Sequence, residues 1–377
     1  MIMKIRLKKL LKRLVREETD PLITVKISRN ALLHNLAQFQ KIKPKNKVVP
    51  VLKSNAYGHG LIEVASILEN KVEFFVIDSY FEALALRNEG IKTSLLVMGY
   101  VRPEVIAKNR LNNISYGISS LDALYSLSSN ANIHLKIDTG MHRQGILPED
   151  MDTAFEYIKN NKNIILEGIC SHLADADNPD TTYTEKQIDL WNSLVKKTLE
   201  KFPSLKLIHL SNSYGHPFAE KINANTSRLG IGLYGLADIE GLDLRPVLEM
   251  RTILTNIKKI KTGDAVGYNN AFIASQYMTI ATIPVGYYEG LDRQLSNKGF
   301  VKIKETDIPI IGKVSMNMTT IDVSALKDLK IGDEVQVISP ITSDRNSIHS
   351  MAQIGETITY ELVVKIPREI KRIIMNT

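Results

Sequence analysis

A lysine stands where an apolar run enters a polar, glycine-bearing turn. Residues 48–52 are Val-Val-Pro-Val-Leu, Lys53 follows them, and residues 54–60 read Ser-Asn-Ala-Tyr-Gly-His-Gly. An amine in such a place can attack an aldehyde, but only when the amine is unprotonated. Since lysine ordinarily has a pKa of about 10.4, that reaction requires desolvation or neighbouring cations. The ordinary alternative is a lysine that extends from a buried strand into solvent.

Other polar clusters also follow apolar runs. Lys136 and Arg143 flank Ile-Asp-Thr-Gly-Met-His, which on its own indicates a solvated loop with a salt bridge. His172 lies in Cys-Ser-His-Leu-Ala-Asp-Ala-Asp, and a hydrogen-bonded core histidine is the plain interpretation. A transition metal would require further His or Cys ligands at short spacing, and none stands out, so we expect no metal site.

Two later runs end in residues suited to binding phosphate. Asn212 and Ser213 follow one run, and Gly230 and Ile231 follow the next. Barrel enzymes commonly bind phosphate in the loops after their last two strands, through backbone amides and hydroxyls, and glycine allows close approach. Close packing is the alternative explanation for the glycine.

The elements that would position these residues are repeated strand–helix units. Segments such as 79–88 and 184–202, with apolar residues three or four apart, separate about eight short apolar runs, which predicts a TIM-type (β/α)8 barrel. An open doubly wound sheet is the alternative. The predicted strands are residues 48–53, 73–78, 94–99, 113–117, 133–138, 165–172, 206–211 and 227–233.

After residue 240 the pattern changes to β-branched runs separated by turns, which predicts a mainly antiparallel β domain. The turns are residues 261–264, 296–299 and 330–333. We therefore expect a barrel over residues 21–240 and a β domain over residues 241–377, with residues 22–27 able to join the latter.

The lysine segment, Lys-Ser-Asn-Ala-Tyr-Gly-His-Gly, resembles that of the alanine racemase family, whose matching lysine carries pyridoxal 5'-phosphate (PLP) as a Schiff base. The likeness extends from about residue 22 to the end, and it implies the same barrel and β domain. By this resemblance Lys136 can be carbamylated, Arg143 orients a catalytic tyrosine, and His172 lies beside the PLP ring. Arg228 would face the pyridine nitrogen. Because guanidinium only donates hydrogen bonds, that nitrogen would stay unprotonated, which weakens the cofactor as an electron sink and suits racemisation.

The resemblance also assigns roles in the β domain. Tyr268 would be the base opposite Lys53 at the substrate Cα, and a phenol in that role needs nearby cations such as Arg143. Since the family's β domain reaches the barrel of the other subunit, a homodimer with shared active sites follows. Tyr287 would line the substrate entrance, Met316 would offer its backbone amide to the substrate carboxylate, and Tyr360 and Tyr57 would bind the cofactor phosphate.

This chain departs from the family's pattern at Ser315-Met316-Asn317, where many members have Cys-Met-Asp, and at Asn269, where glycine is common. Loss of a carboxylate at Asn317 removes a charge near the substrate. We expect a PLP-dependent racemase that interconverts L- and D-alanine for peptidoglycan, with a broad-spectrum or serine/lysine racemase as the alternative. A noncatalytic PLP-binding regulatory barrel is the alternative of another class, and a barrel decarboxylase would place an acid at Arg228.

Bulk composition fits an ordinary soluble globular protein. The 377 residues are 44% hydrophobic and 24% charged, enough for a large core and two domains. One cysteine, Cys170, allows no internal disulfide, and we expect a cytoplasmic protein.

The net charge of +7 is concentrated at the N-terminus, where residues 1–20 carry seven basic and three acidic side chains. We therefore expect no nucleic-acid partner, because such proteins concentrate charge on a folded face. Apolar residues at helical spacing predict a basic amphipathic extension there. Lysines interrupt every apolar run, which excludes a secretory signal. Packing on the protein or its partner subunit is favoured over contact with an anionic membrane.

Overall fold

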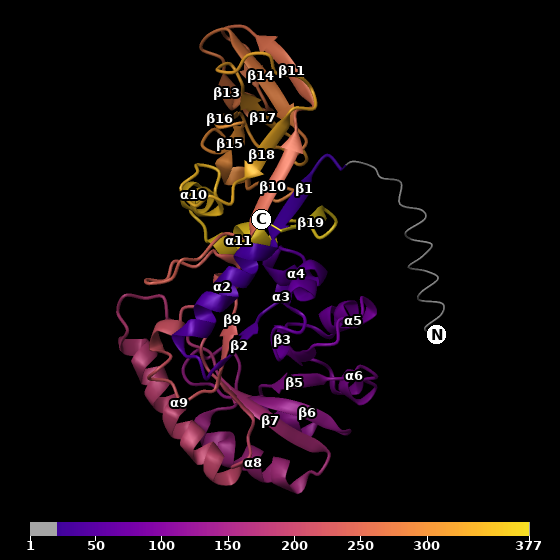
Figure 1. Cartoon of the computed structure of the whole chain (residues 1–377), viewed down its shortest axis with the longest axis vertical. Helices are drawn as coiled ribbons and strands as arrows, with labels where there is room; N and C mark the ends of the chain where they lie inside the picture. Colours follow the sequence, from indigo (N-terminus) through magenta and orange to yellow (C-terminus); the bar gives the residue numbers. More distant parts are fainter. Residues whose placement is uncertain (1–20, 377) are drawn as a thin grey trace.

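The computed structural model describes residues 21–376. It places a barrel of alternating strands and helices at one end of an elongated molecule and a β domain at the other (Figure 1). The basic amphipathic segment predicted over residues 1–20 lies outside the described residues.

The eight-stranded parallel barrel is confirmed. Strands pair in chain order from β3 to β9, and β9 pairs with β2. A bridge between Val51 and Val76, with Leu52 N donating to Val76 O at 2.7 Å, brings β2 beside β3, so the barrel is nearly closed and the open-sheet alternative is wrong. The last predicted strand is shorter than expected, because the chain turns into a 3-10 helix after Leu229. The strands are β2 (Lys47–Pro50), β3 (Phe74–Ile77), β4 (Ser94–Val97), β5 (Ile114–Ile118), β6 (Ala131–Lys136), β7 (Ile164–Cys170), β8 (Leu207–His209) and β9 (Thr226–Leu229).

Helices before and between these strands cover the outside of the barrel. The longest one buries a face with Ile188, Trp191 and Val195, the three- and four-residue spacing of an amphipathic helix. Another begins at a capping box, in which the Ser79 hydroxyl accepts from Glu82 N. The helices are α2 (Arg29–Ile42), α3 (Lys53–Tyr57), α4 (Leu61–Leu68), α5 (Tyr80–Asn88), α6 (Pro103–Ala107), α7 (Leu121–Tyr125), α8 (Met151–Asn160) and α9 (Thr182–Lys201), with short 3-10 turns η1 (Pro148–Asp150), η2 (His216–Phe218) and η3 (Ile231–Tyr234).

The second domain is a nine-stranded sheet that is antiparallel except where β1 runs parallel to β19. Strand β1, from the start of the described chain, lies between β10 and β19 in this sheet, so both ends of the described chain belong to it. The strands are β1 (Thr24–Ser28), β10 (Leu248–Ile253), β11 (Asn256–Ile260), β14 (Met278–Ile283), β15 (Phe300–Ile303), β16 (Thr306–Ile311), β17 (Thr319–Asp322), β18 (Glu334–Ile338) and β19 (Lys371–Met375). A hairpin of β12 (Ala265–Val266) and β13 (Phe272–Ile273), helices α10 (Ile348–Ile354) and α11 (Thr359–Val364), and turns η4 (Tyr268–Asn270) and η5 (Arg293–Leu295) complete it.

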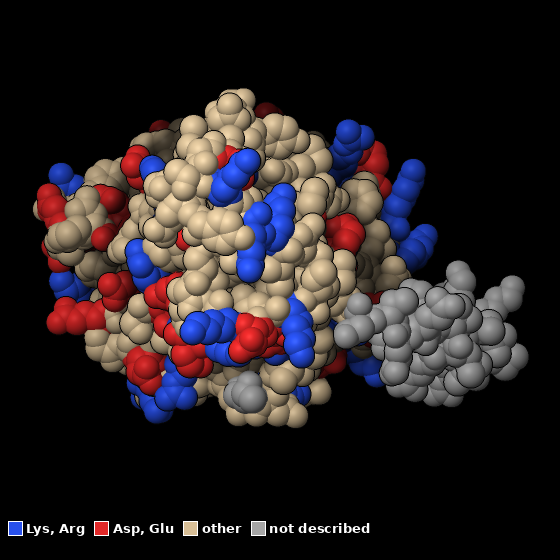
Figure 2. Space-filling model, turned by 90° about the horizontal axis from the view of Figure 1, so that it is seen from above, with Lys and Arg blue, Asp and Glu red and all other residues tan. Residues whose placement is uncertain are grey.

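The two domains meet at the barrel mouth, where α11 packs against α3. At the far end of the β domain, basic and acidic side chains are interspersed on the face seen in Figure 2. Within residues 21–376, none of the helices combines the length and the apolar content that crossing a bilayer requires.

Candidate active site

Lys53 begins a left-handed turn at the end of β2. Ser54, Asn55, Ala56 and Tyr57 have φ angles of 56°, 57°, 53° and 52°, and the turn is closed by hydrogen bonds such as Ala56 N to Leu52 O at 2.8 Å. For L-residues this conformation costs roughly 1–2 kcal/mol per residue, and runs of it are rare. The sequence predicted a polar turn here but not its hand, because none of these four residues is a glycine.

The second domain holds this turn in place. Arg372 on β19 donates from Nη2 to Gly58 O at 2.8 Å. Gly58, with φ of 80°, packs so closely on α11 that a Cβ would lie 1.8 Å from Val363 O. A strained conformation persists only where surrounding contacts fix it. The β domain therefore fixes the backbone that presents Lys53.

A cavity of about 550 Å³ opens beside Lys53 at the carboxyl ends of the barrel strands. It is bounded by strand-end loops and by α11, the place where barrel enzymes build their sites. Residues that the sequence analysis did not single out also line it, among them Asp78, Met98, Tyr100 and Gln144. The predicted site residues that the structure brings together here are Lys53, Tyr57, Lys136, Arg143, His172, Asn212, Ser213, Arg228, Gly230, Ile231 and Tyr360.

Arg228 is buried at the floor of this cavity and is held on several sides. Nη1 donates to His209 O at 3.0 Å and to His209 Nδ1 at 2.6 Å, while Nη2 donates to Ser171 O at 2.6 Å and to His172 Nδ1 at 3.1 Å. Burial lowers the pKa of Arg228 from its ordinary value. The contacts fix the plane of the guanidinium where it lines the cavity.

Two buried histidines extend this network away from the cavity. His209 Nε2 lies 2.8 Å from His134 Nδ1. Since Arg228 can only donate, His209 accepts at Nδ1 and donates from Nε2 to His134. Burial, with a further contribution from Arg228, holds the pKa of His209 well below its ordinary value and lowers the pKa of His134 to about 3. Neither histidine was predicted from the sequence, although their places inside buried strands could have indicated them.

A group of donors forms a cradle around Gly230. The Ser213 hydroxyl accepts from Gly230 N and Gly232 N, each at 3.1 Å. A Cβ at Gly230 would lie only 2.9 Å from the Tyr57 hydroxyl, so the bare backbone keeps this space open. Burial raises the pKa of Tyr57 to about 12, although Arg228 opposes the shift, and burial also raises the pKa of Tyr360. Both phenols therefore stay protonated and can donate to an anion such as phosphate.

Lys136 and His172 complete the wall. Burial lowers the pKa of Lys136, and its Nζ donates to Gln144 Oε1 at 3.1 Å. Burial first, and then Arg228, keep the pKa of His172 well below its ordinary value, so its ring is neutral. Arg143 is exposed on the same wall. The cavity thus combines a lysine amine, a fixed cation at Arg228, an exposed one at Arg143 and neutral donors, a set that fits an anionic aromatic aldehyde.

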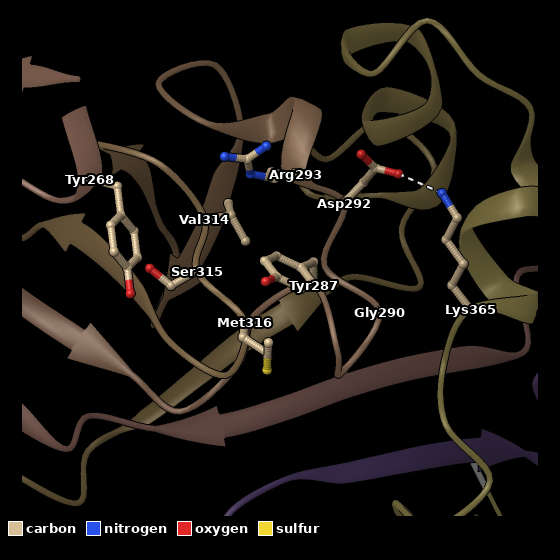
Figure 3. Close-up of a pocket in the computed structure, with 9 residues that line it drawn as sticks. All are labelled: Tyr268, Tyr287, Gly290, Asp292, Arg293, Val314, Ser315, Met316 and Lys365. Atoms are coloured by element: carbon tan, nitrogen blue, oxygen red, sulfur yellow. Dashed lines mark hydrogen bonds and ion pairs between the residues drawn. The ribbon is translucent and has the colours of Figure 1, made fainter.

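The remaining predicted residues lie elsewhere in the same chain. Tyr268, Tyr287 and Met316 line a second cavity of about 600 Å³ within the β domain. In Figure 3 the rings of Tyr268 and Tyr287 stand on either side of Ser315, and Asp292 binds Lys365. Tyr268 is 68% exposed. Within one chain, then, the structure does not bring Tyr268, Tyr287 or Met316 to Lys53.

Residues 21–376 contain no group of three or more His, Cys, Asp or Glu side chains arranged to hold a metal ion. Cys170 is buried and free. The first cavity offers amine, guanidinium, imidazole and hydroxyl groups to a ligand, and a carboxylate at Asp78.

Comparison with known proteins agrees with this geometry. Residues 27–238 match the family model for the alanine racemase N-terminal domain, and residues 247–374 match that for the C-terminal domain. The chain is 34% identical over 369 residues to an alanine racemase of Methanococcus maripaludis, covering 94% of this chain and 99% of that protein. It is 36% identical over 370 residues to alanine racemase 1 of Caldanaerobacter subterraneus subsp. tengcongensis, covering 93% and 94%.

Solved structures give the same result. An alanine racemase of Clostridium difficile superimposes with a TM-score of 0.87 at 28% identity, covering 95% of this chain and 97% of that chain. A Bacillus anthracis alanine racemase with bound L-Ala-P superimposes with a TM-score of 0.85 at 27% identity, covering 95% and 96%. Both domains, the fold and most of the sequence are matched, and this chain belongs to the alanine racemase family.

Proposed function

We propose that this protein is an alanine racemase that interconverts L- and D-alanine with PLP held in the cavity at Lys53, and that its product serves peptidoglycan synthesis. The observation that carries the proposal is the convergence of Lys53, Arg228 and the cradle around Gly230 on one cavity. The cavity lies within the range of about 300–1,000 Å³ that is usual for small-molecule sites. A cytoplasmic location, inferred from cysteine usage, is part of the proposal.

The cavity's residues fit PLP at both ends. Tyr57, Tyr360, Ser213 and the amides near Gly230 would hold the phosphate, and Arg228 would donate to the ring nitrogen. When bound, PLP supplies an electron sink that acidifies the α-proton of an amino acid attached to it. Because guanidinium only donates hydrogen bonds, Arg228 would leave that nitrogen unprotonated and the sink moderate, which would favour return of a proton at Cα over other outcomes.

Racemisation needs proton-transfer groups on both faces of the substrate Cα. Lys53 serves one face and Tyr268 the other. Since Tyr268 lies in a different cavity from Lys53 within one chain, the proposal requires a homodimer in which Tyr268 of a second copy reaches the barrel mouth. Its exposure, at 68%, leaves the ring accessible to such a partner.

The remaining site residues position the substrate and the tyrosine. Met316 N would meet the substrate carboxylate, Tyr287 would narrow the entrance, and Arg143 would stand beside Tyr268. The lowered pKa of Lys136 leaves more of its amine neutral, the form that reacts with carbon dioxide, so we include its carbamylation in the proposal.

Hydrogen exchange in deuterated water tests this function. Purified protein with PLP is incubated separately with L-alanine and D-alanine, and NMR follows loss of the α-proton signal while a chiral assay follows the enantiomer. We expect Tyr268→Phe to suppress abstraction from one enantiomer selectively while the absorbance of bound PLP is kept. Full activity in both directions without that hydroxyl would contradict the two-base assignment. Serine and lysine, tested alongside, measure the substrate range.

Subunit mixing tests the shared site. Lys53→Ala and Tyr268→Phe proteins, each impaired alone, are unfolded together and refolded as a mixture. Mixed dimers should regain activity, because one of their two sites combines both intact residues. No recovery above the separate proteins would contradict a site built from two subunits.

A further inference from the structure

A buried carboxylate joins the two segments that line the second cavity. Glu289 is 8% exposed, and each of its oxygens accepts a hydrogen bond. Oε2 accepts from Gly286 N at 2.9 Å, on its own segment, and Oε1 accepts from Asn317 Nδ2 at 2.8 Å, on the other. A buried charge needs such partners, since leaving one oxygen unpaired costs the full desolvation of that group.

The same segments are joined by backbone hydrogen bonds directly beside this pair. Tyr287 N donates to Ser315 O at 3.0 Å, and Tyr288 N donates to Met316 O at 2.9 Å. The segments lie so close that a Cβ on Gly286 would be 2.2 Å from Ser315 O. The spacing of Tyr287 and Met316, which line the cavity, therefore depends on how residues 285–291 and 314–319 are held together.

We propose that Glu289 and Asn317 form a positioning pair that sets Tyr287 and the Met316 amide for the substrate carboxylate. This inference rests on the proposed function and adds to it a residue, Glu289, to which the family resemblance assigned no role. It also gives a structural reason for the Ser315-Met316-Asn317 sequence, where many family members have Cys-Met-Asp. Asn317 is the donor that Glu289 requires, and the carboxylate of this region stands at position 289.

The hydrogen bond of this pair runs from Asn317 as donor to Glu289 as acceptor, and two substitutions together can reverse it. Asn317→Asp would place two carboxylates at the present 2.8 Å separation with no donor between them. The double variant Glu289→Gln with Asn317→Asp restores a donor–acceptor pair with the polarity reversed. The Gln oxygen can still accept from Gly286 N while its amide donates to the new carboxylate at position 317. Net charge is the same in the wild type and the double variant.

The test measures alanine racemisation and carboxylate binding by holoenzyme. We expect Asn317→Asp to raise KM for alanine about tenfold, the size of one lost hydrogen bond to a charged group. We expect kcat to change by less than about twofold, as for a loss of ground-state positioning. Calorimetric titration with propionate, which needs no turnover, should show the same loss of affinity. In the double variant, KM for alanine and affinity for propionate should both return most of the way to the wild-type values.

The matched control is Asn161→Asp, where the side-chain oxygen only accepts from Asn163 N and a carboxylate serves equally. It should leave KM and propionate affinity unchanged. If Asn317→Asp does not fold, Asn317→Ala removes the donor without adding charge, and the same KM rise is expected.

Unchanged KM and propionate affinity in the Asn317 variants would overturn the proposal, as would a double variant no better than Asn317→Asp. Wild-type protein without racemase activity would instead count against the proposed function, a result separate from these.

Discussion

Nη1 of Arg228 donates to Nδ1 of His209 at 2.6 Å, so the cation at the cavity floor is held by a neutral ring. No carboxylate accepts from this guanidinium among its hydrogen bonds within the described chain, and its partners are carbonyls and imidazoles. An acidic neighbour would draw the donors away from the cavity. No carboxylate therefore neutralises the charge of Arg228 through these hydrogen bonds where it lines the cavity.

Replacing Arg228 with lysine should cost both stability and activity. One ammonium has three N–H donors, too few for the five acceptors that Arg228 binds, so we expect a loss of about 2–3 kcal/mol in the free energy of unfolding. Racemase kcat should fall at least about tenfold, because the donor to the ring nitrogen is displaced. Urea unfolding and steady-state kinetics measure the two effects. Arg251→Lys, in a partly exposed pair with Glu249, is the control and should lose less than about 1 kcal/mol. Equal losses in the two variants would contradict the role assigned to the Arg228 network.

Gly230→Ala should weaken PLP binding with little effect on the apo-protein. The new methyl would stand in the cradle, 2.9 Å from the Tyr57 hydroxyl, which lies at the end of a side chain that can shift when no ligand is present. We expect the Kd for PLP to rise at least about tenfold, since backbone approach to a phosphate depends on glycine there. Absorbance titration of apo-protein measures it. At Gly117 the nearest atoms to an added Cβ are 3.4 Å away, so Gly117→Ala should bind PLP normally. Tight binding of PLP by the Gly230→Ala variant would contradict the placement of the phosphate in this cradle.

The left-handed turn after Lys53 can be probed at Ser54, which is exposed and has φ of 56°. Ser54→Gly relieves strain and should be neutral or stabilising by up to about 1 kcal/mol, whereas Ser54→Val, with a β-branched side chain, should destabilise by about 1–2 kcal/mol. If Ser54 lay in an ordinary helix or strand, the valine variant would instead be more stable than the glycine variant. Urea unfolding of both variants therefore distinguishes the observed hand of the turn from a right-handed one.

Acid should destabilise the protein through its buried neutral histidines. Burial lowers the pKa of His216 to about 4, from an ordinary 6.5. Between these values the unfolded chain binds a proton that the folded protein does not, so the free energy of unfolding falls as pH falls from 6.5 toward 4 and is unaffected above that window. His216→Phe removes the titrating imidazole beside Phe39. The decrease in the free energy of unfolding between about pH 7.5 and 5.5 should therefore be smaller by about 1 kcal/mol in the variant. An unchanged pH dependence would show that His216 titrates normally in the folded state.

The sequence could predict the barrel because inward-facing strands of a parallel sheet are short apolar runs, and about eight of them are visible between helical segments. It could also predict Lys53 and Gly230, because strand-end loops meet at one mouth of a barrel, whereas the role expected of Arg228 came from the family resemblance. Nothing local indicated the hand of the turn at residues 54–57, since its strain is compensated by Arg372 and Val363 from the other domain. The Glu289–Asn317 contact likewise joins residues far apart in the chain, and only the fold shows that one is the other's donor.

The most direct test of the account is the identity of the lysine that carries PLP. Holo-protein is reduced with sodium borohydride, digested and analysed by mass spectrometry, with Lys53→Arg protein treated in parallel. We predict one peptide bearing a pyridoxyl group at Lys53 and no modified peptide in the variant. Modification of another lysine in the cavity, such as Lys136, or retention of the adduct in the variant, would contradict the central claim.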